Sequence, residues 1–219
     1  MTPSYKLLSL MSISDTIQIG GSMKIIESIS FLKGNYKITT KDQELLYLNE
    51  ETFIHSGLYK GCEISEDSWA QLEEENQFYE ARDLSLGYLR RRRTSGEIKY
   101  FLKEKGFNQA CLDRVIEYLN DYQLINDEDY IKDHIHDQFY LQKNGPRKIK
   151  FKLMNKFLDP GIIDTHLANL PHEDLEKMVK ELIEKKYGPG PFSLKEKQKI
   201  NRYLQNKGYP YPAISKELF

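Results

Sequence analysis

The chain has 219 residues, of which 39% are hydrophobic and 30% charged, and its formal net charge is −1. This composition excludes an intrinsically disordered chain, and no apolar run approaches the length of a membrane span. The two cysteines, Cys62 and Cys111, lie far apart and outside any metal-ligand spacing, which predicts a reduced, cytoplasmic setting rather than a disulfide scaffold.

The small net charge conceals two oppositely charged parts of the chain. Residues 1–80 carry a net charge of −7 and residues 81–219 a net charge of +6. A positive region favours an anionic partner, although folded helices also carry mixed charge for solubility alone.

The first part of the chain is predicted to form a tail followed by a small module. We expect residues 1–22 to form a flexible tail, with Met1 or Met23 as the translation start. Residues 23–77 predict a strand-plus-helix module, with short strands separated by the turn sequence Lys33-Gly34-Asn35. Asn49 predicts the N-cap of a short helix that ends before Gly57, and Ser65 the opening of a longer one.

From about residue 78 the pattern is helical and repeats at an offset of 51 residues. Apolar residues held at one period over three copies indicate a supersecondary unit stacked on itself. We therefore predict a mainly α fold, in which tandem three-helix repeats form an elongated curved array behind a small N-terminal β-rich module. The predicted repeats are residues 78–126, 127–170 and 171–219. The recurring positions are Ile98, Ile149 and Ile200; Leu102, Leu153 and Leu204; Leu112, Ile163 and Ile214; and Ile116, Leu167 and Leu218.

Capping residues predict where these helices begin and end. The first helix of the first repeat is expected to run from Phe78 to Arg92, and Thr94 or Ser95 to cap the next. Gly106 can take the left-handed conformation that ends that helix. Asp127 is expected to cap the first helix of the second repeat, and Ser193 with Glu196 predicts a capping box in the third.

Four consecutive arginines are the most concentrated charge in the chain. Near a helix C-terminus they would be stabilised by the helix dipole, and they suit contacts to phosphate or to an acidic protein surface. The alternative is a solvated helix end whose arginines pair with nearby carboxylates. These residues are Arg90, Arg91, Arg92 and Arg93.

A second basic group surrounds the predicted middle helix of the second repeat. Three of its lysines are spaced by four residues and would form one stripe along that helix. A one-sided stripe is better evidence for an interaction surface than scattered lysines, but it does not distinguish DNA from an acidic protein groove. The group is Lys143, Arg147, Lys148, Lys150, Lys152 and Lys156.

Sequence patterns of catalysis are missing. The chain has no phosphate-binding loop, dinucleotide-binding glycine motif, zinc-protease helix or nucleophile elbow. His134 and His136 would face opposite sides of a helix, so they cannot chelate one metal. We predict a binding protein rather than an enzyme, with no catalytic residue, cofactor or metal.

Several of these segments resemble the RecX family, which regulates the RecA recombinase. The resemblance is carried by residues 81–93 (ARDLSLGYLRRRR), 95–98 (SGEI), 102–107 (LKEKGF), 124–130 (LINDEDY) and 145–149 (GPRKI). It covers nearly the whole chain after Met23, because the leader is similar to the β-rich extension of longer members. Phe157 departs from the family pattern, which usually has Gly there, and this puts the local turn in doubt.

The resemblance implies a function in DNA recombination, DNA repair and the SOS response. It implies binding to the RecA–DNA filament, in its deep groove, by a cytoplasmic protein that we expect to be a monomer and to need no membrane. Filament extension, ATP hydrolysis, strand exchange and coprotease activity would then fall. The alternative is a helical-repeat protein that binds nucleic acid directly and acts by competing for DNA.

Overall fold

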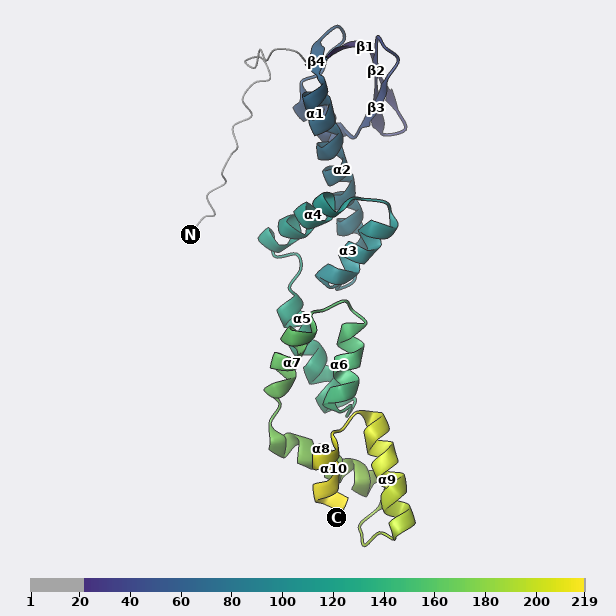
Figure 1. Cartoon of the computed structure of the whole chain (residues 1–219), viewed down its shortest axis with the longest axis vertical. Helices are drawn as coiled ribbons and strands as arrows, with labels where there is room; N and C mark the ends of the chain where they lie inside the picture. Colours follow the sequence, from purple (N-terminus) through teal and green to yellow (C-terminus); the bar gives the residue numbers. More distant parts are fainter. Residues whose placement is uncertain (1–21, 219) are drawn as a thin grey trace, which may run out of the picture. The chain divides into compact units, whose positions relative to one another are not determined.

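A computed structural model describes residues 22–218 of the chain (Figure 1). It divides into two compact units, one ending at Glu80 and one beginning at Ala81. The predicted tail lies, apart from Ser22, outside the described residues. The repeat boundaries remain a prediction, and the fold class, mainly helical with a small N-terminal β module, is confirmed.

The first unit is built on a four-stranded antiparallel sheet in the order β3-β2-β1-β4. Lys33 and Gly34 both have positive φ angles, 53° and 89°, as a two-residue turn between twisted strands requires. The short edge strand β4 was not predicted, because three residues are too few for an alternating pattern. The strands are β1 (Met23–Leu32), β2 (Asn35–Thr40), β3 (Leu45–Leu48) and β4 (Glu63–Ser65).

Two helices complete this unit. Helix α1 (Glu50–Ser56) begins at Asn49, whose side chain accepts from the backbone N–H of Thr52, and ends at Gly57 in the left-handed conformation, as predicted. Helix α2 (Glu66–Tyr88) follows β4 and supplies Trp69 to the core. The other buried residues of this core cluster are Ile26, Ile38, Leu46, Leu48 and Ile64.

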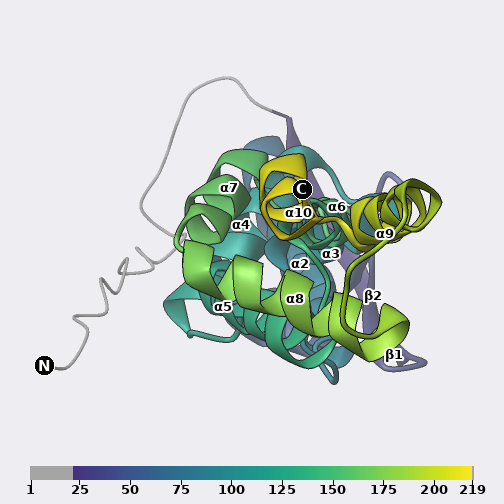
Figure 2. The same cartoon turned by 90° about the horizontal axis from the view of Figure 1, so that it is seen from below.

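The second unit is helical. After the end of α2 come α3 (Ser95–Glu104) and α4 (Gln109–Asp121), then α5 (Asp127–His136), the π-helical turn η2 (Asp137–Leu141), α6 (Pro146–Met154) and α7 (Pro160–Ala168). The last three helices are α8 (His172–Tyr187), α9 (Leu194–Lys207) and α10 (Tyr211–Leu218). Figures 1 and 2 both show α10 against α8, and residues of these two helices are in contact.

The 51-residue period corresponds to the core of this unit. The first three recurring sets are almost fully buried, and the fourth is less enclosed, since Ile116 and Leu167 are only half-buried. The period is therefore the spacing at which equivalent helices present the same apolar face.

The turn after the middle helix of each repeat uses one backbone conformation. Gly106, Phe157 and Gly208 are 51 residues apart and have φ angles of 92°, 57° and 92°. Phe157 thus adopts the left-handed conformation although it is not glycine, which costs on the order of 1–3 kcal/mol. Its ring stacks on Tyr100, with centroids 5.1 Å apart, and this contact offsets part of the strain.

The helix that was expected to begin at Phe78 does not begin there, because Phe78 lies inside α2, which begins at Glu66. Two other predicted helix boundaries are also wrong. Helix α2 ends at Tyr88 rather than at Arg92, so the arginines lie in the connection to α3 and not on a helix. Asn126, not Asp127, is the N-cap of α5. Both errors arise because neighbouring residues with similar capping or helical propensity compete for one boundary.

Candidate partner-binding surface

Equivalent hydrogen bonds join consecutive repeats and thereby position the basic side chains. The Thr94 hydroxyl donates to the backbone carbonyl of Lys156 at 2.6 Å. Fifty-one residues further on, the Gly145 backbone N–H donates to the carbonyl of Lys207 at 2.7 Å. In both cases the N-terminus of one middle helix, α3 or α6, meets the turn that ends the next, so the basic residues near these helix ends are brought together.

These junctions are close enough to require glycine. A Cβ atom on Gly96 would lie 2.5 Å from the Cβ of Phe157, and one on Gly145 would lie 2.4 Å from the backbone of Gly208. Real Cβ atoms do not approach so closely. The spacing of the repeats is therefore fixed by backbone packing.

The four predicted arginines have different environments. The connection that carries them, residues 89–94, is called the arginine loop below. Arg92 pairs with Asp133 at 2.5 Å and lies over the Tyr130 ring. Arg93 lies 4.3 Å from the centre of the Tyr88 ring and 3.4 Å from Glu97. Arg90 and Arg91 are exposed and make no ion pair with another described residue.

Lys156 is an anchor between repeats. Its ammonium group donates to the carboxylate of Glu97 at 2.8 Å, and this hydrogen bond raises the pKa of Lys156. Burial alone would raise the pKa of Glu97, but the hydrogen bonds from Lys156 and from the Thr94 backbone hold it below its ordinary value. Lys156 lies in the turn after α6 and not on the helix. Because its ammonium group is paired with Glu97, Lys156 is largely unavailable to a partner.

The remaining predicted residues divide into engaged and open side chains. Lys143 pairs with Glu181, and Lys152 donates to the amide oxygen of Gln138 at 2.6 Å. Lys150, in the same region, pairs with Asp164. Arg147 and Lys148 make no side-chain hydrogen bond or ion pair with the described residues.

A cluster of lysines spans α6, α8 and α9. The pKa of Lys207 is lowered by burial and then by the positive charges of three other lysines, so each of these three lies within electrostatic range of Lys207. Sequence reasoning missed two of them, although Lys207 stands 51 residues after Lys156 and the repeat could have identified it. We refer to Lys148, Lys152, Lys186 and Lys207 as the central basic cluster.

His134 borders this cluster. Its pKa is lowered by burial and then by the charges of Lys152 and Lys156. The imidazole beside the lysines is therefore neutral and adds no further positive charge to the cluster.

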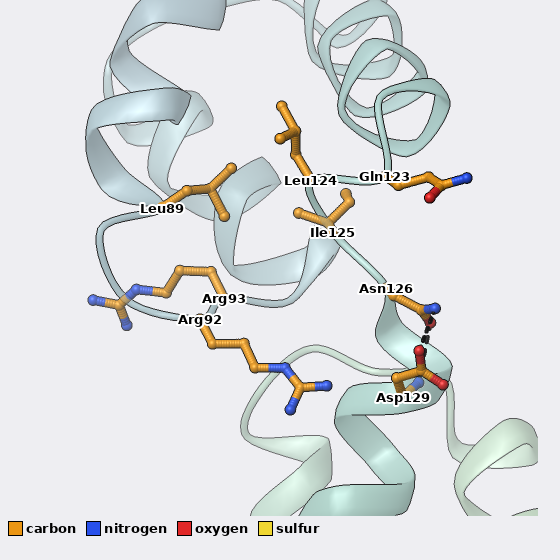
Figure 3. Close-up of a pocket in the computed structure, with 8 residues that line it drawn as sticks. All are labelled: Leu89, Arg92, Arg93, Gln123, Leu124, Ile125, Asn126 and Asp129. Atoms are coloured by element: carbon orange, nitrogen blue, oxygen red, sulfur yellow. Dashed lines mark hydrogen bonds between the residues drawn. The ribbon is translucent and has the colours of Figure 1, made fainter.

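A small pocket opens between the arginine loop and the connection from α4 to α5 (Figure 3). Its volume is about 220 Å³. Apolar side chains form its walls and polar ones its rim. The lining residues are Leu89, Arg92, Arg93, Gln123, Leu124, Ile125, Asn126 and Asp129.

Residues 22–218 show neither a metal-ligand cluster nor a membrane-spanning helix. No group of three or more histidine, cysteine, aspartate or glutamate side chains in this part of the chain could hold a metal ion. None of its helices combines the length and the hydropathy that crossing a bilayer requires.

Comparisons with known proteins decide the family. Residues 173–218 match the family model described as "RecX, third three-helix domain". A curated relative named "Regulatory protein RecX", from Lactococcus lactis subsp. lactis (strain IL1403), is 32% identical over 87% of this chain and 74% of its own length. The chain belongs to the RecX family. A second relative of the same name, from Clostridium perfringens (strain 13 / Type A), is 32% identical over 80% of each chain.

Solved structures agree with the fold. "Crystal structure of regulatory protein RecX" superimposes with a TM-score of 0.65 and 24% identity, covering 89% of this chain and 98% of the other. "Crystal structure of RecX from Lactobacillus salivarius" gives a TM-score of 0.55 and 23% identity, covering 65% and 95%. A regulatory role therefore follows from membership of the RecX family, whose named relatives are regulatory proteins.

Proposed function

We propose that this chain regulates the RecA recombinase by binding its filament on DNA and limiting filament extension. ATP hydrolysis, strand exchange and coprotease activity would then decrease in recombination and DNA repair. The central basic cluster carries the proposal, because it gathers positive charge from α6, α8 and α9, and because its member Lys148 and the neighbouring Arg147 have open side chains.

The physical basis is multivalent electrostatic contact. Repeated units present several basic groups at fixed spacing, and contacts made together bind far more tightly than each would alone. Their counterparts would be acidic protein walls or DNA phosphates in the filament. In this proposal the chain acts in the cytoplasm as a monomer without cofactor or catalysis, and the recombinase alone hydrolyses ATP.

An ATPase titration tests the proposal. Purified RecA on single-stranded DNA is mixed with increasing amounts of the chain at physiological salt. We expect hydrolysis to fall when the chain is present at far fewer copies than the recombinase, because blocking an end or a groove affects many subunits. Unchanged hydrolysis and unchanged filament length at excess protein would refute the proposal.

One observation favours direct nucleic-acid binding as a second candidate. The Phe151 ring is 64% exposed on α6, on the same side of the helix as Arg147 and Lys148. An exposed ring beside cations can stack on a base while the cations hold the backbone. If this candidate is correct, Phe151→Ala weakens binding to single-stranded oligonucleotides about tenfold. Equal affinity of both proteins for the oligonucleotide would exclude it.

A further inference from the structure

We propose that the pocket beside the arginine loop receives one bulky apolar side chain, of leucine or phenylalanine size, from an acidic segment of a protein partner. The inference extends the proposed function by adding a specific contact to an electrostatic surface. It rests on the proposed function only for the identity of the partner.

The size of the pocket suits a single side chain. Its volume of about 220 Å³ is below the roughly 300–1,000 Å³ of sites that enclose a small-molecule ligand. Figure 3 shows Leu89 on one wall and Leu124 and Ile125 on the other, facing one another across the opening. Leu124 is 45% exposed although it belongs to this apolar wall. An incoming apolar group would remove this surface from water.

The second repeat shows how the chain itself fills the corresponding space. In the first repeat, the Tyr88 ring stacks on Phe101, with centroids 4.3 Å apart. In the second repeat, the residue equivalent to Phe101 is Lys152, 51 residues further on, and it contacts Gln138. Tyr88 therefore corresponds to Gln138, at an offset of 50, because the π-helical turn η2 holds one extra residue.

The next residue along then differs between the repeats. Leu89 is the counterpart of Phe139, which is fully buried in the core formed by the second and third repeats. Leu89 is only half-buried and lines the pocket. Where the second repeat places an aromatic ring of its own, the first repeat has a shorter side chain and leaves space for one from elsewhere.

The rim favours an acidic segment around that side chain. Arg92 lines the pocket, and its ion pair with Asp133 is exposed on both partners, so a carboxylate from outside can replace Asp133 at little cost. Arg90 and Arg91 in the same loop are open to a second and third carboxylate. The one acidic group on the rim, Asp129, is already engaged by the Asn126 side-chain amide at 2.7 Å.

A peptide titration followed by NMR tests the pocket without the recombinase. The probe is a blocked pentapeptide with phenylalanine flanked by two aspartates on each side, added to the isotope-labelled full chain. A peptide with alanine in place of phenylalanine is the control. We expect the phenylalanine peptide to shift the amide signals of Leu89 and residues 123–126 and to bind about tenfold more tightly than the control, since one apolar side chain becomes buried.

Two variants make the test specific. Leu89→Phe fills the pocket with the residue that the second repeat carries, and Leu84→Phe adds the same bulk at a site on α2 that is 41% exposed. We expect Leu89→Phe to bind both peptides equally and Leu84→Phe to behave as the unaltered chain. Leu124→Gln changes an exposed wall residue and gives the same readout if Leu89→Phe does not fold.

The inference is overturned if both peptides bind the unaltered chain equally, or if Leu89→Phe and Leu124→Gln leave the preference for phenylalanine intact. It is also overturned if an oligothymidylate, and not the phenylalanine peptide, shifts the pocket signals. A chain that binds the peptide but leaves RecA ATP hydrolysis unchanged supports the pocket and contradicts the proposed function, so the two can fail separately.

Discussion

The Thr94 hydroxyl donates a 2.6 Å hydrogen bond to the carbonyl of Lys156, 62 residues away, while it accepts from the backbone N–H of Glu97 in its own helix. One buried side chain therefore caps α3 and also ties it to the next repeat. The equivalent tie one repeat further on is a backbone hydrogen bond, which the Gly145 N–H donates to the carbonyl of Lys207. The junctions between repeats, rather than the repeats themselves, determine where the basic groups lie.

Removing the Thr94 hydroxyl should cost more than removing a helix cap. Thr94→Val loses the cap and the bond to Lys156, and we expect the free energy of unfolding to fall by about 2–3 kcal/mol. Ser193→Ala is the control, because Ser193 forms the same capping box on α9 but is exposed; about 1 kcal/mol is expected there. Urea denaturation followed by circular dichroism measures both losses, and equal losses would show that the contact with Lys156 contributes nothing.

The buried carboxylate of Glu97 should make stability depend on pH. Its pKa is lower in the folded chain than the ordinary 4.5, so its stabilising contribution is complete above pH 4.5 and is lost as pH falls through the folded-state pKa. Glu97→Gln should therefore lose about 1–3 kcal/mol at pH 7 and less at low pH. Glu104→Gln, an exposed site on the same helix, serves as the control. Parallel stability curves for Glu97→Gln and the unaltered chain between pH 7 and pH 3 would contradict this account.

Two glycines with the same backbone conformation should respond differently to alanine. Gly106 and Gly208 both have φ angles of 92°, but a Cβ on Gly106 meets open space, whereas one on Gly208 lies 2.5 Å from the Lys148 backbone nitrogen. Gly106→Ala should lower the free energy of unfolding by about 1–2 kcal/mol, which is the cost of holding alanine in the left-handed conformation. In Gly208→Ala the added methyl group must also push α6 away from the turn after α9. Because such overpacking is destabilising, we expect the free energy of unfolding to fall by about 2 kcal/mol more than in Gly106→Ala. Thermal unfolding of the two variants compares them directly, and similar midpoints would mean that the junction is looser than described.

Charge reversal in the central basic cluster should weaken regulation without unfolding the chain. Lys148→Glu with Lys152→Glu is expected to raise the amount of protein needed for half-inhibition of RecA ATP hydrolysis at least about tenfold, because attraction becomes repulsion at both sites. Lys41→Glu with Lys60→Glu changes the net charge equally on the first unit, at exposed positions, and should leave inhibition unaltered. Full inhibition by a folded Lys148/Lys152 variant would show that these lysines only solubilise α6.

Much of the local structure could be predicted because it depends on short-range chemistry. Asn49 and Thr94 cap helices as predicted, and the capping box at Ser193 forms. The apolar period identified the core because burial, unlike a helix end, is fixed by many residues at once.

What could not be predicted depends on partners that are distant in the sequence. Asp127 was expected to cap its own helix, but its carboxylate accepts instead from the backbone N–H of Ser95 at 2.9 Å. Lys156 belonged to the predicted basic stripe, yet Glu97, 59 residues away, engages it. Such contacts decide whether a cation is available to a partner or already paired within the fold. The sequence pattern alone therefore could not separate Lys148 from Lys156.

Cosedimentation tests whether the partner of this chain is the recombinase filament. The chain is centrifuged with RecA filaments assembled on single-stranded DNA and, separately, with the same DNA alone, at physiological salt. We expect the chain to pellet with the filament, the Lys148/Lys152 charge reversal to weaken this binding at least about tenfold, and bare DNA to retain much less of the chain. Retention by bare DNA that equals or exceeds retention by the filament would contradict this expectation.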